Sequence, residues 1–113
     1  MAGGAPAPTV APMTTHATAS DSDLAYAGLA RQAELVRSGA LGARELVERS
    51  LERIARHDPA LGAFRVVRAE RALEEADAAQ ERLRAGDPAP LLGVPVAVKD
   101  NVDVAGERTC HGT

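Results

Sequence analysis

The stretch LLGVPVAVKDN, residues 91–101, is a nearly continuous apolar run that ends in three polar side chains. An apolar run of this length, bounded by turn-forming residues, favours a buried strand over residues 91–98. In α/β folds, strands commonly deliver functional groups at the point where the chain leaves the sheet. The polar residues Lys99, Asp100 and Asn101 are therefore the candidate functional residues.

Three helices and a second strand are expected upstream of this run. A side-chain oxygen of Asp21 or Ser22 can cap the first helix, and apolar residues recur at helical spacing along the second and third. The residue before a proline is pushed out of the helical region, so Pro59 should close the second helix. The expected helices cover residues 21–36, 43–56 and 69–84, and the expected strand covers residues 63–67.

The alternation of helices and strands predicts an α/β fold with an incomplete core. Residues 1–20 are rich in Ala, Pro and Thr and should form a disordered tail, which leaves residues 21–113 to fold. Apolar residues make up 45% of the chain but aromatic residues only 2%, so the core would consist mainly of Ala, Leu and Val. Because a small domain buries only about 60% of its unfolded surface, we expect this part to lack a C-terminal partner.

Charge and composition argue against several classes of function. The formal net charge is −3, and no cationic block or aromatic platform is present for phosphates or bases, so nucleic-acid binding is not expected. No apolar run reaches the roughly 20 residues that span a bilayer, so we expect a cytoplasmic protein without membrane contact. No glycine-rich phosphate-binding motif occurs, and no cofactor is expected.

Cys110 is the only cysteine, which excludes an internal disulfide and a cysteine-based zinc site. His16, His57 and His111 share no spacing that would converge on a metal. Cys110 and His111 are adjacent, and neighbouring residues of an extended chain point to opposite faces. We therefore interpret Cys110 as a small packing residue and not as a nucleophile beside its base.

Lys99 has an ordinary interpretation and a functional one. A lysine after an apolar strand commonly marks the return of the chain to solvent. Residues 92–106, however, read LGVPVAVKDNVDVAG and resemble the G-[IV]-P-[IV]-x-[IV]-K-D-N-[IV]-D-x-x-G segment of the amidase-signature family. Four upstream segments fall in the same order and spacing as that family's N-terminal helices: residues 33–39, 43–47, 53–54 and 61–64.

The resemblance covers residues 24–113 and departs from the family pattern at two places. Gly42 stands where a capping serine is common, and residues 110–113 read Cys-His-Gly-Thr where a Thr-x-Gly-Ser ending is usual. These departures leave the assignment of Lys99 unchanged, but they argue against an auxiliary catalytic role for the residues near Thr113.

The resemblance implies a three-layer α/β/α sandwich around a mixed sheet, of which this chain would supply the first helices and strands. It also implies a triad in which a nucleophilic serine attacks an amide carbonyl, a serine in a cis peptide relays the proton, and Lys99 is the base. Lys99 would have to be buried to be neutral, and the apolar run before it is consistent with burial. Both serines and the oxyanion loop would follow Thr113, so this fragment alone should be inactive. Asp100 and Asn101 match the motif and would orient the loop after the strand.

Several functions stay open at this point. The resemblance fits an amidase that hydrolyses a small-molecule carboxamide, with a homodimer as one compatible assembly. It also fits the A subunit of a glutamyl-tRNA amidotransferase, although the Ala- and Pro-rich tail favours the stand-alone amidase. From other classes, the chain could be a non-catalytic helical interaction module or a truncated, inert product.

Overall fold

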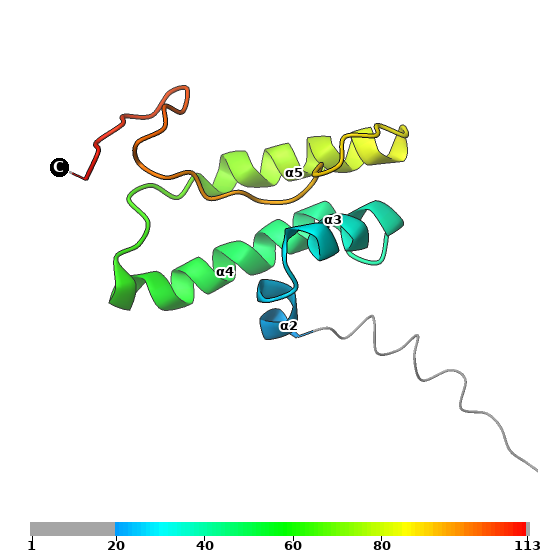
Figure 1. Cartoon of the computed structure of the whole chain (residues 1–113), viewed down its shortest axis with the longest axis horizontal. Coiled ribbons are helices and arrows are strands. Elements are labelled where there is room, and N and C mark those ends of the chain that lie inside the picture. The colour runs from blue at the N-terminus through cyan, green and yellow to red at the C-terminus, as the bar shows by residue number, and fades with distance from the viewer. Residues whose placement is uncertain (1–19, 113) are drawn as a thin grey trace, which may run out of the picture.

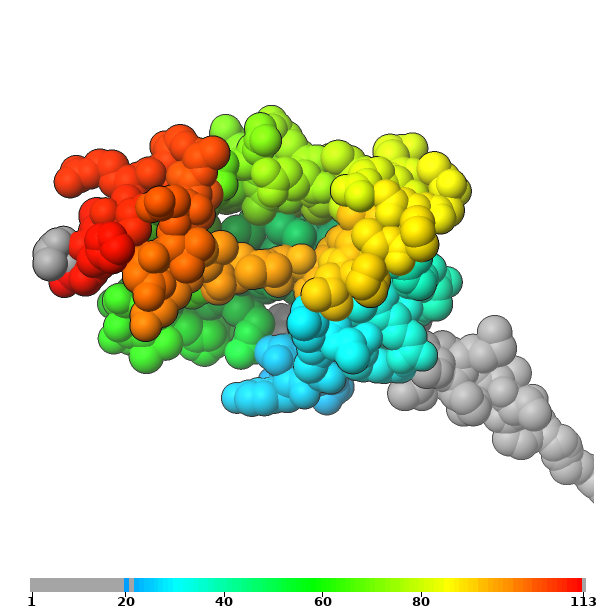
Figure 2. Space-filling model, turned by 45° about the horizontal axis from the view of Figure 1, so that its top comes forward, coloured from blue at the N-terminus to red at the C-terminus, as the bar shows by residue number. Residues whose placement is uncertain are grey.

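The computed structural model describes residues 20–112, and every regular element in this range is a helix. The elements are α2 (Asp21–Ala25), α3 (Leu29–Ser38), α4 (Ala43–Leu61) and α5 (Ala69–Arg84). In Figure 1, the long helices α4 and α5 lie side by side and run in opposite directions, and the chain after α5 returns along them. Figure 2 shows this returning segment on the surface of the helical layer. The tail predicted for residues 1–20 lies outside the described residues, apart from its last residue.

The single helix predicted over residues 21–36 is wrong, because the structure has two helices there. Ser20 caps α2 through a capping box: its Oγ accepts from the Asp23 N–H at 3.1 Å, and the Asp23 carboxylate accepts from the Ser20 N–H at 3.3 Å. The chain then breaks at Gly28, whose φ of +87° is incompatible with a helix. The helix that follows, α3, ends two residues after the predicted position 36, on Gly39 in the left-handed conformation.

The second helix continues past its predicted end at residue 56. Pro59 lies inside the last turn of α4, and the helix ends on Gly62 in the left-handed conformation. Proline removes one backbone donor there, and Asp58 provides other bonds at the same end. Its carbonyl accepts from the Gly62 N–H at 2.7 Å, and its carboxylate accepts from the next two N–H groups at 2.6 and 3.0 Å. The third predicted helix is confirmed, with the predicted bounds, as α5.

The two predicted strands, over residues 63–67 and 91–98, do not form within residues 20–112. A strand requires ladder hydrogen bonds to a neighbouring strand. The backbone bonds around the second segment are instead local turn bonds, from the Leu92 N–H to the Ala89 carbonyl and from the Val94 N–H to the Leu91 carbonyl. The described part of the chain is therefore about half helical, and the α/β prediction is met here only by its helices.

The core lies where α4 meets α3 and α5. Its largest fully buried side chains are Val36, which is 1% exposed, and Leu46, which is 2% exposed. Full burial of such a side chain contributes about 1.5–3 kcal/mol. As the composition predicted, the surrounding core residues are small or aliphatic: Leu24, Leu41, Ala43, Val47 and Ala76.

The segment that follows α5 crosses this core at Gly93. The residue has a φ of +88°, and a Cβ placed on it would lie 2.9 Å from Val36 Cγ1 and 3.3 Å from Ala43 Cβ. The same atom would lie 3.5 Å from Leu83 Cδ1. Only a residue without a side chain can approach α3, α4 and α5 this closely. Gly93 therefore fixes the point from which residues 94–99 begin.

Replacing Gly93 with alanine should lower the free energy of unfolding by about 2–4 kcal/mol, because the methyl group clashes with Val36 and the positive φ strains the backbone. Gly86→Ala is the matched control, since Gly86 has a φ of +87° but no atom within 4 Å of an added Cβ. The free energy of unfolding of that variant should fall only by the cost of the strained backbone, about 1–2 kcal/mol. Urea unfolding followed by circular dichroism measures both losses, and equal losses would contradict the close packing at Gly93.

Candidate functional site

Lys99 lies at the end of the extended segment that starts at Gly93, and its side chain is exposed. The apolar residues before it are also uncovered within the described range: Val96 is 76% exposed and Val98 is 52% exposed. The burial that the apolar run suggested for Lys99 is therefore not found within residues 20–112. Residues 93–99 instead place Lys99 outside the helical core, because Gly93 is packed against the helices at the start of the segment.

A turn follows Lys99 and contains the other two candidate residues. The Lys99 carbonyl accepts from the Val102 N–H at 3.1 Å, which closes the turn over Asp100 and Asn101. Asn101 is exposed, whereas Asp100 is partly buried. The three residues that sequence analysis selected are thus adjacent in space, but only Asp100 points its side chain into contacts with the rest of the described chain.

Asp100 joins three separate parts of the chain. Arg65 donates to its carboxylate twice, from Nε to Oδ2 at 3.0 Å and from Nη2 to Oδ1 at 3.2 Å. The Cys110 N–H donates to Oδ1 at 3.0 Å, and the His111 N–H donates to the Asp100 carbonyl at 2.9 Å. Arg65 Nη2 also donates to the Arg108 carbonyl. We call residues 99–111 the clamped loop, because these contacts close it on itself and on the linker between α4 and α5.

The electrostatics of this pair favour both charged forms. The hydrogen bond from the Cys110 N–H, followed by the bond from Arg65, lowers the pKa of Asp100 below its ordinary value of 3.8. The hydrogen bond to Asp100 raises the pKa of Arg65. Charged partners stabilise one another in this way, so the ion pair is present throughout the neutral range. The two side chains are 39% and 32% exposed, which makes the pair a partly solvated clamp.

Further contacts order the second half of the clamped loop. Arg68, three residues after Arg65, forms an ion pair with Glu107, with 3.4 Å between Arg68 Nε and Glu107 Oε1. The Thr109 hydroxyl donates to Asp103 at 2.6 Å. Gly106 turns the chain with a φ of +85°, a conformation that favours glycine. Two arginines of the α4–α5 linker therefore reach the loop, and Figure 1 shows the loop at the end of the helical pair where that linker lies.

Sequence reasoning missed Arg65. It lies within the segment FRVVR, residues 64–68, where two arginines stand three residues apart in a stretch interpreted as a strand. No spacing rule connects a linker arginine with an aspartate 35 residues later. The pair could be recognised only after the linker and the returning segment had been placed at the same end of the helices.

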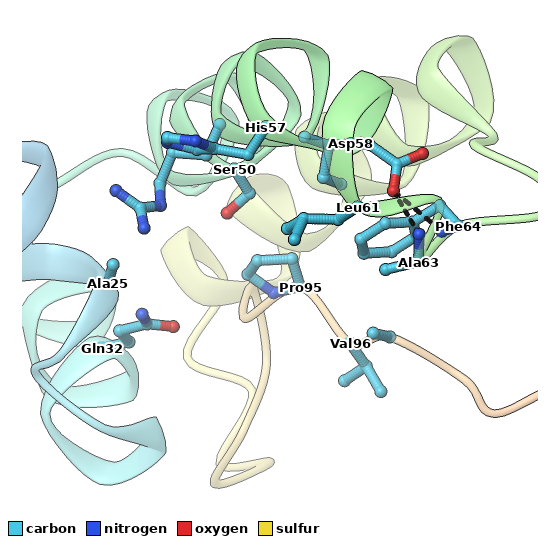
Figure 3. Close-up of a pocket in the computed structure, with 13 residues that line it drawn as sticks. Ala25, Gln32, Ser50, His57, Asp58, Leu61, Ala63, Phe64, Pro95 and Val96 are labelled. Atoms are coloured by element: carbon cyan, nitrogen blue, oxygen red, sulfur yellow. Dashed lines mark hydrogen bonds between the residues drawn. The ribbon is translucent and has the colours of Figure 1, made fainter.

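A groove of about 420 Å³ lies between the C-terminal half of α4 and residues 95–97. Figure 3 shows Leu61, Phe64 and Pro95 facing one another along it. Three of the polar residues that line it bond to nearby backbone: Gln32 donates to the Leu24 carbonyl, Ser50 donates to the Leu46 carbonyl, and Asp58 accepts from the Ala63 and Phe64 N–H groups. Lys99 does not line this groove, so the groove and the motif residues are separate features of the chain.

The described residues offer no metal site, since no three His, Cys, Asp or Glu side chains cluster there. His57 lines the groove and His111 lies in the terminal turn, while His16 is outside the described range. Cys110 is partly buried, and its backbone N–H donates to the Asp100 carboxylate. No helix between residues 20 and 112 is long and apolar enough to cross a membrane.

Comparison with known proteins finds a family model described as Amidase, which matches residues 45–113. The chain is 55% identical over 92 residues to the Mycobacterium tuberculosis (strain H37Rv) protein named "Putative amidase AmiB2", with 81% of this chain and 20% of that protein covered. It is 58% identical over 74 residues to "Putative amidase AmiA2" of Mycobacterium bovis, with 66% and 15% covered. It is also 48% identical over 75 residues to the glutamyl-tRNA(Gln) amidotransferase A subunit of Desulforapulum autotrophicum, with 66% and 15% covered.

The chain spans a fifth or less of the length of these relatives, and no solved structure matches it. The match to the family model includes Arg65, Lys99 and the clamped loop.

Removing the guanidinium with Arg65→Ala should raise the pKa of Asp100 toward 3.8 without reaching it, because the Cys110 N–H is the larger cause of the lowered pKa and stays in place. A lowered aspartate pKa stabilises the fold above the unfolded pKa, and this contribution is lost as the pH falls through the folded pKa. The clamped loop should therefore open only in acid below about pH 4, and at a higher pH in the variant than in the wild type.

An NMR titration of the Asp100 carboxyl carbon measures these pKa values. Arg71→Ala is the control, because it removes an exposed arginine paired with Glu75 on α5 and leaves the clamped loop untouched. The same Asp100 pKa in wild type and Arg65→Ala would contradict the bidentate pair.

Proposed function

The chain belongs to the amidase family, and from that premise we propose that it forms the N-terminal part of an amidase in which Lys99 is the general base. The observation that supports this most directly is the Lys99-Asp100-Asn101 segment, which lies inside the range that the family model matches. The substrate class is a small-molecule carboxamide, which is cleaved to a carboxylate and ammonia or an amine.

In the proposed reaction, a serine hydroxyl attacks the amide carbonyl and passes its proton to a second serine, in a cis peptide, which in turn protonates Lys99 Nζ. The tetrahedral intermediate collapses when the C–N bond breaks, and the leaving nitrogen takes the proton back through the same relay. Water then hydrolyses the acyl-enzyme, with the relay accepting the proton of that water. We assign both serines to a part of the full-length protein outside the fifth of the relatives' length that this chain covers.

Lys99 can accept a proton only if its amine is neutral, whereas free lysine titrates at about pH 10.4. Desolvation lowers a lysine pKa, but Lys99 is exposed within the described residues. We propose that the remaining part of the protein covers residues 94–99 with neighbouring strands of a three-layer α/β/α sandwich. The exposed Val96 and Val98 support this assignment, because they form the apolar surface that such strands would bury.

The A subunit of a glutamyl-tRNA amidotransferase is the second candidate, since a relative with that name is 48% identical. The higher identity of the two amidase-named relatives, 55% and 58%, favours the stand-alone amidase. The two functions differ in substrate. Ammonia release from glutamine that depends on a second protein would identify the amidotransferase, and hydrolysis of simple carboxamides without a partner would identify the amidase.

In the full-length protein, Lys99→Ala should lower kcat by at least about 100-fold, because it removes the general base. Lys99→Arg should be equally inactive, since a guanidinium keeps its proton at any accessible pH. Steady-state hydrolysis of a carboxamide panel measures the loss. Arg44→Ala is the matched control: it removes a cation that joins α4 to α5 through Asp77 at 2.7 Å, away from the clamped loop. Full activity of Lys99→Ala would rule out the proposed triad.

The 113-residue chain on its own should hydrolyse none of these amides, because it contributes the base without the nucleophile. It should also bind a hydrophobic dye through the uncovered valines at positions 96 and 98. Dye fluorescence and an amidase assay on the isolated chain test this. Measurable hydrolysis by the isolated chain would show that the proposed division of the triad is wrong.

A further inference from the structure

We propose that Arg65 is a positioning residue for Lys99: its bidentate pairing with Asp100 holds the clamped loop so that the Lys99 amine is presented at a fixed place. This inference rests on the proposed function of Lys99. It adds a residue of the α4–α5 linker to the machinery, although that residue lies outside the Lys-Asp-Asn motif.

Arg65 is itself held in place by the end of α4. The Asp58 carboxylate accepts from the N–H groups of Ala63 at 2.6 Å and Phe64 at 3.0 Å, shown as dashed lines in Figure 3. Arg65 follows directly, and the linker joins α5 four residues later. The guanidinium therefore starts from a short segment that is fastened at both ends to long helices.

The Arg65 side chain makes three hydrogen bonds in two directions. Two go to the Asp100 carboxylate at 3.0 and 3.2 Å, and the third goes to the Arg108 carbonyl on the returning side of the clamped loop. A planar guanidinium fixes both the distance and the orientation of a carboxylate, which an ammonium cannot do. One side chain thus joins both ends of the clamped loop to the helices.

The consequence for Lys99 follows from its two neighbours along the chain. Six residues before it, Gly93 is packed against Val36, Ala43 and Leu83. Directly after it, Asp100 is held by its carboxylate through Arg65 and by its carbonyl through the His111 N–H at 2.9 Å. The backbone is therefore held on both sides of Lys99, at Gly93 and at Asp100. Loss of the Arg65 contact would detach Asp100 from the α4–α5 linker, while the bonds from the Cys110 and His111 N–H groups within the clamped loop and the packing of Gly93 would stay in place.

The pair is suited to positioning more than to folding. Partly exposed ion pairs add little to stability, because solvent screens them and ordering the side chains costs entropy. Arg65 and Asp100 are 39% and 32% exposed. Removing the guanidinium should therefore leave a folded protein whose Lys99 is displaced, and this allows activity to be measured on the variant.

The test compares Arg65→Ala, Arg65→Lys and the control Arg44→Ala in the full-length enzyme, each assayed for kcat, KM and the pH dependence of kcat/KM. Displacing a catalytic group by about 1 Å can cost roughly 100-fold, so we expect kcat to fall about 10- to 100-fold in Arg65→Ala with little change in KM. Arg65→Lys should recover part of this loss, because it restores the charge without the bidentate geometry. Arg44→Ala, which removes the contacts of Arg44 with Glu48 and Asp77, should behave as wild type.

The pH profile separates positioning from a general loss of structure. The acid limb of kcat/KM reports the pKa of the base in the free enzyme. If Arg65→Ala lets water reach the base in the full-length enzyme, the acid limb of kcat/KM should shift to higher pH. Adding Asp100→Asn to Arg65→Ala should cost little more than the larger single effect, since both changes break the same contact.

Three outcomes would overturn the inference, and each is distinguishable. If Lys99→Ala is inactive while Arg65→Ala matches Arg44→Ala, the base is confirmed and the positioning role is wrong. A lower kcat in Arg65→Ala with an unmoved acid limb would show a structural effect only. If Lys99→Ala keeps full activity, the proposed function itself fails, and the positioning role fails with it.

Discussion

The close approach of Gly93 to α3, α4 and α5 is the constraint on which the other features of the chain depend. At this point the backbone of an irregular segment touches Val36 and Ala43, two of the most buried residues of the core. The same place holds the N-terminus of α4, where Gly42 offers no side-chain cap. Gln80 of α5 accepts from the N–H of Ala43, the first residue of α4, at 2.9 Å. A neighbouring helix thus satisfies one of the unpaired backbone donors at the N-terminus of α4.

The returning segment after α5 has no ladder partner within the described residues, so other contacts fix its path. At its start, Arg37 of α3 donates to the carbonyls of Asp87 and Ala89. In its middle, Gly93 packs on the core, and at its end Arg65 holds Asp100. Arginine contacts to backbone and carboxylate oxygens therefore do for this segment what a neighbouring strand does in a sheet. They define its path without covering its apolar side chains.

Features set by the local sequence could be predicted, whereas features that depend on contacts between distant residues could not. The bounds of α5 follow from its alanine periodicity, and the end of α3 at Gly39 follows from local chain chemistry. The break at Gly28 and the continuation of α4 through Pro59 were missed, because one glycine or proline can be accommodated in more than one way. The predicted strands failed because an apolar run specifies burial but not the partner that makes it a strand. The motif makes Lys99 a candidate from the sequence alone, whereas the contact of Arg65 with Asp100 spans 35 residues of the chain and no sequence pattern predicts it.

Lys99 differs from every other cation of the chain. Of the 13 Lys and Arg residues in the sequence, it is the only lysine. Arginine keeps its charge in all protein settings and suits the clamps that hold Asp87 and Asp100, whereas lysine can give up its proton when water is excluded. Burying exposed valines contributes about 1.5–3 kcal/mol each. In the proposed enzyme, the strands that cover Val96 and Val98 would also withdraw Lys99 from water, so the sheet that completes the fold would also favour the uncharged form of the base.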